Sequence, residues 1–233
     1  MTALITETIP PFDYLRLSER FPDHWPFFLS SLSSGQIASA RWSILMRKTG
    51  ETLDAHLGDL PDFLSTLDEQ IHSGGAISES ELPFCGGWFV YLGYELASQI
   101  EPTLSLPPSE DNLPMAFAAR CGSAVIHDHW TGAVYLVSET DLLHQAAKVE
   151  IGLTSAEQAS GAGLGSGSSN DVVGIHWTVE VDPPSEFEAG VRSILEYIKA
   201  GDVFQVNLSR GWRAVSHDSV HPLSIFRALC HSN

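Results

Sequence analysis

Uncharged polar side chains alternate with apolar ones in the stretch FQVNLS, residues 204–209. This period of two predicts a strand with one apolar face and one polar face. The polar face carries two amides and one hydroxyl, from Gln205, Asn207 and Ser209. Solvated sheet faces usually carry charged side chains, whereas buried amides and hydroxyls need hydrogen-bond partners. We therefore expect these three residues to support a polar pocket, with a solvated sheet face as the alternative.

Two other patterns carry weaker chemical signals. His127 and His129 are two residues apart, so one face of a strand would present both to a metal ion. They also border a predicted turn, where exposed polar residues are ordinary. Gly86, Gly87 and Gly93 are not followed by the Lys-Ser/Thr pair of a phosphate-binding loop, and we interpret them as strand glycines that permit close backbone approach.

Strands joined by hairpins are the main elements that would position these residues. Apolar runs predict strands at 25–32 and 40–46, and the glycine-rich and aromatic segment 83–102 predicts another. Residues 118–140 predict a hairpin whose turn, DHWTG, ends at Gly132. Many strands with few helices favour an α+β fold with antiparallel sheets over alternating βα units.

Helical spacing of apolar residues appears in two places. Residues 54–74 predict one helix, and the stretch after Pro184 predicts a longer one. Ser185 and Glu188 have the spacing of a capping box, and Gly201 stands where a left-handed C-terminal cap would be. A further helix is predicted to begin near Leu223.

A shift in composition divides the chain. We predict a first domain at 1–158, a Gly/Ser linker at 159–171 and a second domain at 172–233. The last segment is too short to close a core of its own, so we expect the second domain to be incomplete.

Composition excludes several classes of partner. The chain has 233 residues, 43% of them hydrophobic, and a formal net charge of -17. An acidic surface repels phosphate backbones and anionic lipid, so we expect neither nucleic acid nor membrane partners. Three unpatterned cysteines, and an N-terminus without the basic residues and apolar run of a signal peptide, predict a cytoplasmic protein.

Two long stretches resemble one enzyme family. EYIKAGDVFQVNLSRGW (196–212) is similar to the entry into the chorismate-binding domain of component I of anthranilate synthase and of aminodeoxychorismate synthase. LPFCGGWFVYLGYELASQIEP (82–102) resembles the second signature of that family, which more often has Asp at the position of Glu95. The resemblance favours aminodeoxychorismate synthase, with anthranilate synthase as the near alternative, and it covers only the N-terminal half of the family fold.

The resemblance implies a reaction that needs more than these residues. Family members bind chorismate with magnesium, and ammonia from a glutamine amidotransferase subunit replaces the C4 hydroxyl. In the family, the nucleophile, the catalytic glutamates and the magnesium ligands follow the segment that matches residues 201–233. We therefore assign no catalytic or metal-binding residue, give Gln205, Asn207 and Ser209 a supporting role beside the substrate pocket, and expect the chain alone to be inactive.

The resemblance also implies a tryptophan-type pocket in the N-terminal half. Ser31 matches the family serine that follows the first strand, and Arg41 and Trp42 match a basic-aromatic pair. Ser30 stands where the anthranilate branch usually has Glu, which weakens the expectation of feedback inhibition. A non-catalytic module that binds a glutaminase or an amino acid is the second hypothesis, and an exposed turn is the alternative for Ser31.

Overall fold

The computed structural model describes residues 4–31, 40–56, 62–73, 80–106, 113–153 and 176–232. The chain divides into two compact units, residues 1–167 and residues 168–232. This division falls within the predicted linker 159–171, whose residues lie outside the described ranges. The predicted domain bounds at 158 and 172 stay predictions.

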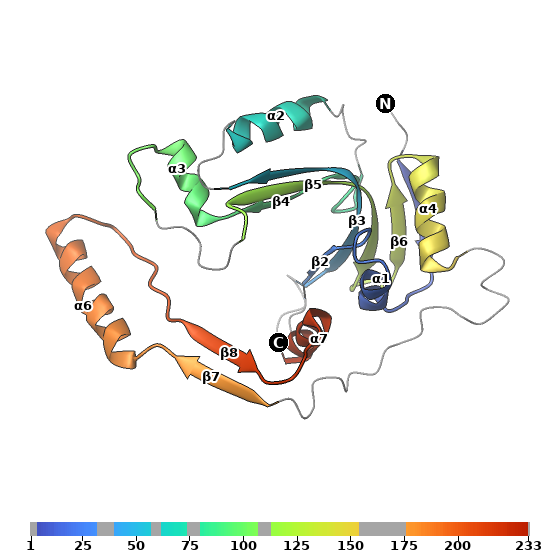
Figure 1. The fold of residues 1–233 in the computed structure, drawn as a ribbon. Coiled ribbons are helices and arrows are strands. Elements are labelled where there is room, and N and C mark those ends of the chain that lie inside the picture. Colours follow the sequence, from blue (N-terminus) through green and yellow to red (C-terminus); the bar gives the residue numbers. More distant parts are fainter. Residues whose placement is uncertain are drawn as a thin grey trace. The chain divides into compact units, whose positions relative to one another are not determined.

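A six-stranded antiparallel sheet forms the first unit (Figure 1). Its strands lie in the order β1-β6-β5-β3-β2, and β4 pairs with β5 beside that path. The strands are β1 (Ile5–Ile9), β2 (Phe27–Ser30), β3 (Trp42–Ala55), β4 (Gly87–Leu92), β5 (Ala116–Asp128) and β6 (Val134–Ser138). The antiparallel sheets and the few helices confirm the predicted α+β class.

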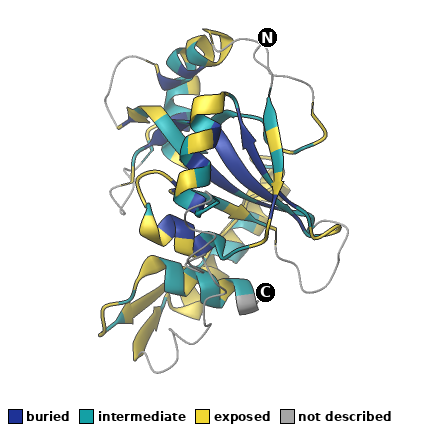
Figure 2. Cartoon of the chain, turned by 90° about the vertical axis from the view of Figure 1, so that its right-hand side faces the viewer, coloured by how far each residue is buried: buried dark blue, intermediate teal, exposed yellow. Residues whose placement is uncertain are grey.

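Helices α1 (Tyr14–Arg20) and α4 (Asp141–Ile151) contribute to the main core of this sheet. Leu17 of α1 and Ile151 of α4 are buried with Trp25 and with residues of four strands. Figure 2 shows the buried residues concentrated on the sheet. The side chain of Thr140 caps the start of α4, and Gly152 ends it in the left-handed conformation. These cap residues of α4 are present in the sequence, although α1, α4 and β1 were not predicted from it.

The predicted strands and hairpin around the sheet centre are confirmed. The run 25–32 contains β2, and the run 40–46 enters β3, with which β2 pairs. The hairpin 118–140 contains most of β5 and all of β6, and Gly132 in its turn has φ of 73°. A positive φ at this position favours glycine, so the glycine allowed the turn to be predicted from the sequence.

Two predictions in the first unit had wrong bounds. Helix α2 (Phe63–Ser73) begins later than residue 54, because Asp54 and Ala55 pair with β5 as the end of β3. The strand predicted at 83–102 is β4 only as far as Leu92, and then the chain forms the 3-10 helix η1 (Tyr94–Leu96) and α3 (Ala97–Ile100). Helical turns bury Leu96 in the core beneath α2, which a continuing strand would not do.

The second unit contains β7 (Trp177–Val181), α6 (Pro184–Ala200), β8 (Trp212–Ser216) and α7 (Pro222–Ser232). Strands β7 and β8 form an antiparallel pair. Gly201 ends α6 with φ of 84°, which confirms the predicted cap. The predicted capping box is wrong, because Pro184 already occupies the first helical position and Ser185 lies inside α6.

No described residue from 176 to 230 is buried. The predicted strand at 204–209 is wrong as a paired strand: these residues have no regular secondary structure. A strand needs a neighbour to satisfy its backbone groups, and none of the described strands pairs with this stretch. None of the described helices is long and apolar enough to cross a membrane.

Candidate functional site

Arg41 lies one residue before β3, and three groups enclose its guanidinium. Nη2 lies 2.9 Å from Asp128 Oδ2, and Nε lies 3.2 Å from Asp128 Oδ1. The ring centroids of Trp42 and Trp130 lie 4.3 Å and 4.6 Å from Arg41 Cζ, within cation–π range. The basic group predicted to line a tryptophan-type pocket is therefore paired with a carboxylate of the same chain.

Asp128 is the buried partner in this cluster. Its side chain is 3% exposed, whereas that of Arg41 is 38% exposed. The hydrogen bonds from Arg41 lower the pKa of Asp128 to about 2, and the backbone N–H of Trp130 contributes a further bond of 3.0 Å. A carboxylate brought by a ligand would have to compete with Asp128 for Arg41.

The serines of the predicted pocket lie where β2 meets β3. Ser31 is exposed, and its backbone N–H donates to the carbonyl oxygen of Trp42 at 3.1 Å. Ser30 Oγ lies 2.7 Å from Ser43 Oγ, which lies 2.8 Å from His129 Nε2. Strand pairing thus brings the predicted serines next to the segment of Trp42, and it adds the buried Ser43, which the sequence analysis missed.

His127 and His129 lie side by side at the end of β5. Their ring centroids are 4.3 Å apart. Burial lowers the pKa of His127, and the neighbouring His129 lowers it further. Within the described ranges, no group of three or more His, Cys, Asp or Glu side chains could hold a metal ion.

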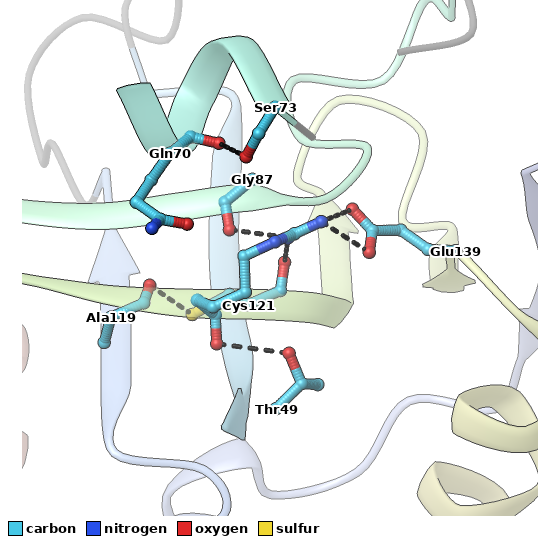
Figure 3. Close-up of polar contacts among 8 residues, drawn as sticks. Thr49, Gln70, Ser73, Gly87, Ala119, Cys121 and Glu139 are labelled. Atoms are coloured by element: carbon cyan, nitrogen blue, oxygen red, sulfur yellow. Dashed lines mark hydrogen bonds and ion pairs between the residues drawn. The ribbon is translucent and has the colours of Figure 1, made fainter. Parts of the chain in front are cut away.

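Gly86 and Gly87 lie beside an ion pair, and Figure 3 shows the contact of Gly87 with it. Arg120 Nη1 donates to the carbonyl oxygen of Gly87 at 2.8 Å, and Arg120 Nη2 donates to both carboxylate oxygens of Glu139. A Cβ atom on Gly86, whose φ is 99°, would lie 2.0 Å from Glu139 Oε1. The glycines therefore permit close approach as predicted, but to a side chain of the β6 end that sequence reasoning did not identify.

The predicted polar row belongs to the second unit. Gln205, Asn207 and Ser209 are all exposed, and Gln205 Nε2 donates to Asn207 Oδ1 at 3.2 Å. They lie in the second unit, whereas Arg41 lies in the first. The supporting role assigned to them stays a prediction.

Comparison with known proteins identifies the family. A family model described as chorismate binding enzyme matches residues 26–233, which is most of the chain. The chain belongs to the chorismate-binding enzyme family. The match covers both units and includes all six residues assigned to candidate sites from sequence.

Relatives of this chorismate-binding chain include both synthase branches. This chain is 29% identical over 226 residues to anthranilate synthase component 1 of Thermus thermophilus, and the alignment covers 93% of this chain and 47% of that protein. It is 28% identical over 152 residues to aminodeoxychorismate synthase component 1 of Bacillus subtilis, covering 64% of this chain and 32% of that protein. The chain therefore spans less than half the length of these relatives.

A solved structure supports the fold. Anthranilate synthase component I from Streptococcus pneumoniae matches with a TM-score of 0.60 and 21% sequence identity, covering 86% of this chain and 48% of that one. This similarity confirms the chorismate-binding fold predicted from the two sequence stretches. At this identity it carries the fold alone.

The magnesium expected in the complete family enzyme stays a prediction, and no described residue of this chain is assigned to hold it. The ion takes oxygen ligands, with one or two carboxylates as its usual protein contribution. Two carboxylates near the groups described above, Asp128 and Glu139, are each held by an arginine. We derive no chemical step through magnesium on the described part of this chorismate-binding chain.

Proposed function

We propose that this chain contributes the N-terminal half of an aminodeoxychorismate synthase component I. Such an enzyme replaces the C4 hydroxyl of chorismate with an amino group and yields 4-amino-4-deoxychorismate for para-aminobenzoate and folate synthesis. The family match over residues 26–233 carries the proposal. The sequence of residues 82–102 and the similarity to the Bacillus subtilis relative support the aminodeoxychorismate synthase branch of the family. The unpatterned cysteines support a cytoplasmic reaction.

In this proposal the chain contributes residues that support the substrate pocket, and it contributes no catalytic group. Amination requires a general acid for the departing hydroxyl, a nucleophile and a cation for the substrate carboxylates. We assign none of these to this chain. Gln205, Asn207 and Ser209 would support the substrate pocket in the complete enzyme. A glutamine amidotransferase subunit would supply ammonia, and residues outside this chain would hold magnesium.

Anthranilate synthase component I is an equally supported alternative. Three relatives carry that name, from Thermus thermophilus, Acinetobacter calcoaceticus and Saccharolobus solfataricus. Both reactions begin from chorismate, so the product separates them. Anthranilate is an aromatic and fluorescent product, whereas 4-amino-4-deoxychorismate is not aromatic.

We further propose that the segment of Ser31, Arg41 and Trp42 is structural and does not bind tryptophan. The pairing of Arg41 with Asp128 supports this proposal. Titration of the chain with tryptophan should give no binding heat up to millimolar concentration. Saturable binding that is lost in Arg41→Gln would overturn it and would favour a regulatory amino-acid module.

The test of function compares three preparations. The chain alone, given chorismate, ammonium and magnesium, should give no product. Co-production with the part of the Bacillus subtilis aminodeoxychorismate synthase component 1 that the match does not cover should give 4-amino-4-deoxychorismate, identified by mass, whereas co-production with the uncovered part of the Thermus thermophilus anthranilate synthase component 1 should give no product. Anthranilate formed only with the Thermus thermophilus part would favour the alternative, and turnover by the chain alone would refute the proposal that residues outside this chain supply the catalytic groups.

A further inference from the structure

Three buried polar atoms at the junction of α4 with the sheet have no hydrogen-bond partner among the described residues. They are Oγ of Ser123 on β5, Oγ of Ser138 on β6 and Nδ1 of His144 on α4. Ser123 and Ser138 are each 1% exposed, and the side chain of His144 is 4% exposed. Bulk solvent therefore does not reach these atoms, and a buried polar atom that lacks a partner lowers stability.

Strand pairing places the two serines side by side. Ser123 and Ser138 are directly opposite each other in the antiparallel pairing of β5 and β6. Residues opposite each other in such a pair point to the same face of the sheet, with Cβ atoms about 4.5–5.5 Å apart. Val125 and Leu136, the next opposed pair on this face, lie in the core with Ala147 of α4. The serines therefore lie on the sheet face that α4 covers.

Two residues in the first turn of α4 bracket the end of β6. His144 Nε2 lies 2.9 Å from Glu7 Oε2 on β1, and a Cβ atom on Gly122 of β5 would lie 2.7 Å from Leu143 Cδ1. Strand β6 lies between β1 and β5 in the sheet. Helix α4 contacts both β5 and β6 (Figure 1). The start of α4 therefore spans the end of β6, where Ser138 lies.

The bond to Glu7 decides which ring nitrogen of His144 carries the proton. An ionised carboxylate only accepts hydrogen bonds, so His144 Nε2 donates to Glu7, which also accepts from Lys148 Nζ at 2.9 Å. In the neutral ring Nδ1 is then an acceptor. Each serine hydroxyl has one donor and can also accept. The three atoms therefore present donors and acceptors that one small molecule with both functions can join.

We infer that one buried water molecule binds between Ser123, Ser138 and His144. It donates to His144 Nδ1 and shares one hydrogen bond with each serine hydroxyl, which gives the count of about three that is typical of a buried water. The two serines leave more room beneath α4 than the neighbouring pair of Val125 and Leu136. The water joins α4 to β5 and β6. The inference concerns the first unit and does not depend on which product the enzyme makes.

Magnetic relaxation dispersion of the water oxygen nucleus tests this inference on the full chain, because it counts the water molecules that a protein holds for longer than its own tumbling time. The unsubstituted chain should hold at least one such water. Ser138→Val replaces a hydroxyl of the site with apolar atoms that fill it, so the count should fall by one. A count of zero for the unsubstituted chain, or equal counts for the two proteins, would overturn the inference.

Thr49→Val is the matched control. Thr49 lies beside Gly122, and its Oγ1 donates to the carbonyl oxygen of Arg120 at 3.2 Å, so this hydroxyl already has a protein partner. Valine has nearly the shape of threonine, and the water count should stay unchanged. A loss in Thr49→Val equal to that in Ser138→Val would place the water elsewhere and overturn the inference.

A high-resolution crystal structure of the unsubstituted chain decides the question if Ser138→Val does not fold. A water oxygen within about 3.2 Å of all three atoms is expected. A serine Oγ bonded directly to His144 Nδ1, with no water between them, would overturn the inference.

Discussion

Glu150 on α4 accepts two hydrogen bonds from Arg47 on β3, at 2.9 Å from Nε and 2.8 Å from Nη2. Trp25 Nε1 adds a third bond at 2.7 Å. The side chains of Arg47 and Glu150 are each 12% exposed. Burial raises the pKa of Glu150, but the bonds from Arg47 and Trp25 outweigh it, so the net pKa lies below its ordinary value. This carboxylate fastens α4 to the sheet.

Glu150→Gln should destabilise the first unit by about 2–4 kcal/mol, because it leaves the Arg47 guanidinium buried without a counter-charge. Urea unfolding followed by tryptophan fluorescence measures the change. Glu19→Gln, at an exposed position at the end of α1, is the control and should change stability by less than about 0.5 kcal/mol. Equal stability of the two variants would contradict the role given to Glu150.

The ion pair between Arg41 and Asp128 should make the stability of the first unit depend on pH below about pH 4. The pKa of Asp128 is lowered from 3.8 to about 2 by Arg41, so its stabilising contribution is complete above about pH 4 and is lost as the pH falls toward 2. Asp128→Asn should cost about 1–2 kcal/mol at pH 7, since Arg41 is partly exposed and solvent screens the pair. The difference from the unsubstituted chain should shrink between pH 4 and pH 2.

Asp54→Asn is the matched control for Asp128, because Asp54 lies exposed on the neighbouring strand β3. Its stability difference from the unsubstituted chain should stay small across the same pH range. A constant difference for Asp128→Asn down to pH 2 would show that the Arg41 pair does not depend on charge.

Gly86→Ala should destabilise more than Gly132→Ala. Both glycines have positive φ, at 99° and 73°, but a Cβ atom at Gly132 meets nothing within 4 Å. Backbone strain alone should cost about 1–2 kcal/mol at Gly132. At Gly86 the methyl group also displaces Glu139 from Arg120, and the total should reach about 2–4 kcal/mol. Thermal unfolding of the two variants compares them, and equal losses would mean that Glu139 moves aside at no cost.

Amide exchange in the chain alone should divide along the burial pattern. Strand β5 is buried along most of its length, whereas no residue of α6 is buried. Local opening needs less free energy where few apolar contacts must break. We expect the α6 amides to exchange on the order of a thousandfold faster than those of β5. Comparable protection of the two elements would indicate a core that supports α6.

The features predicted best from the sequence are those that depend on residues close together along the chain. The hairpin at 118–140 and the cap at Gly201 follow from residues a few positions apart, and both are confirmed. The caps of α4, Thr140 and Gly152, were equally local and could have been used. Such signals act on the backbone directly, so tertiary packing seldom overrides them.

Features that depend on register could not be predicted from local patterns. Arg41 and Asp128 are 87 residues apart in sequence, and β3–β5 pairing brings them together. Arg120 and Glu139 meet in the same way through the pairing of β5 and β6. In the stretch 204–209 the local pattern was misleading. Its alternation of apolar and polar residues favours a strand, but none of the described strands pairs with it.

Strand β5 pairs with two strands, β4 and then β6, one after the other along the same edge. Its residues 116–121 pair with β4, its residues 123–127 pair with β6, and β3 pairs along the opposite edge. A single inserted residue at Gly122 would turn every later side chain to the opposite face and would mismatch two ladders at once. The middle of β5 should therefore be the position in this chain least tolerant of insertions and deletions during evolution.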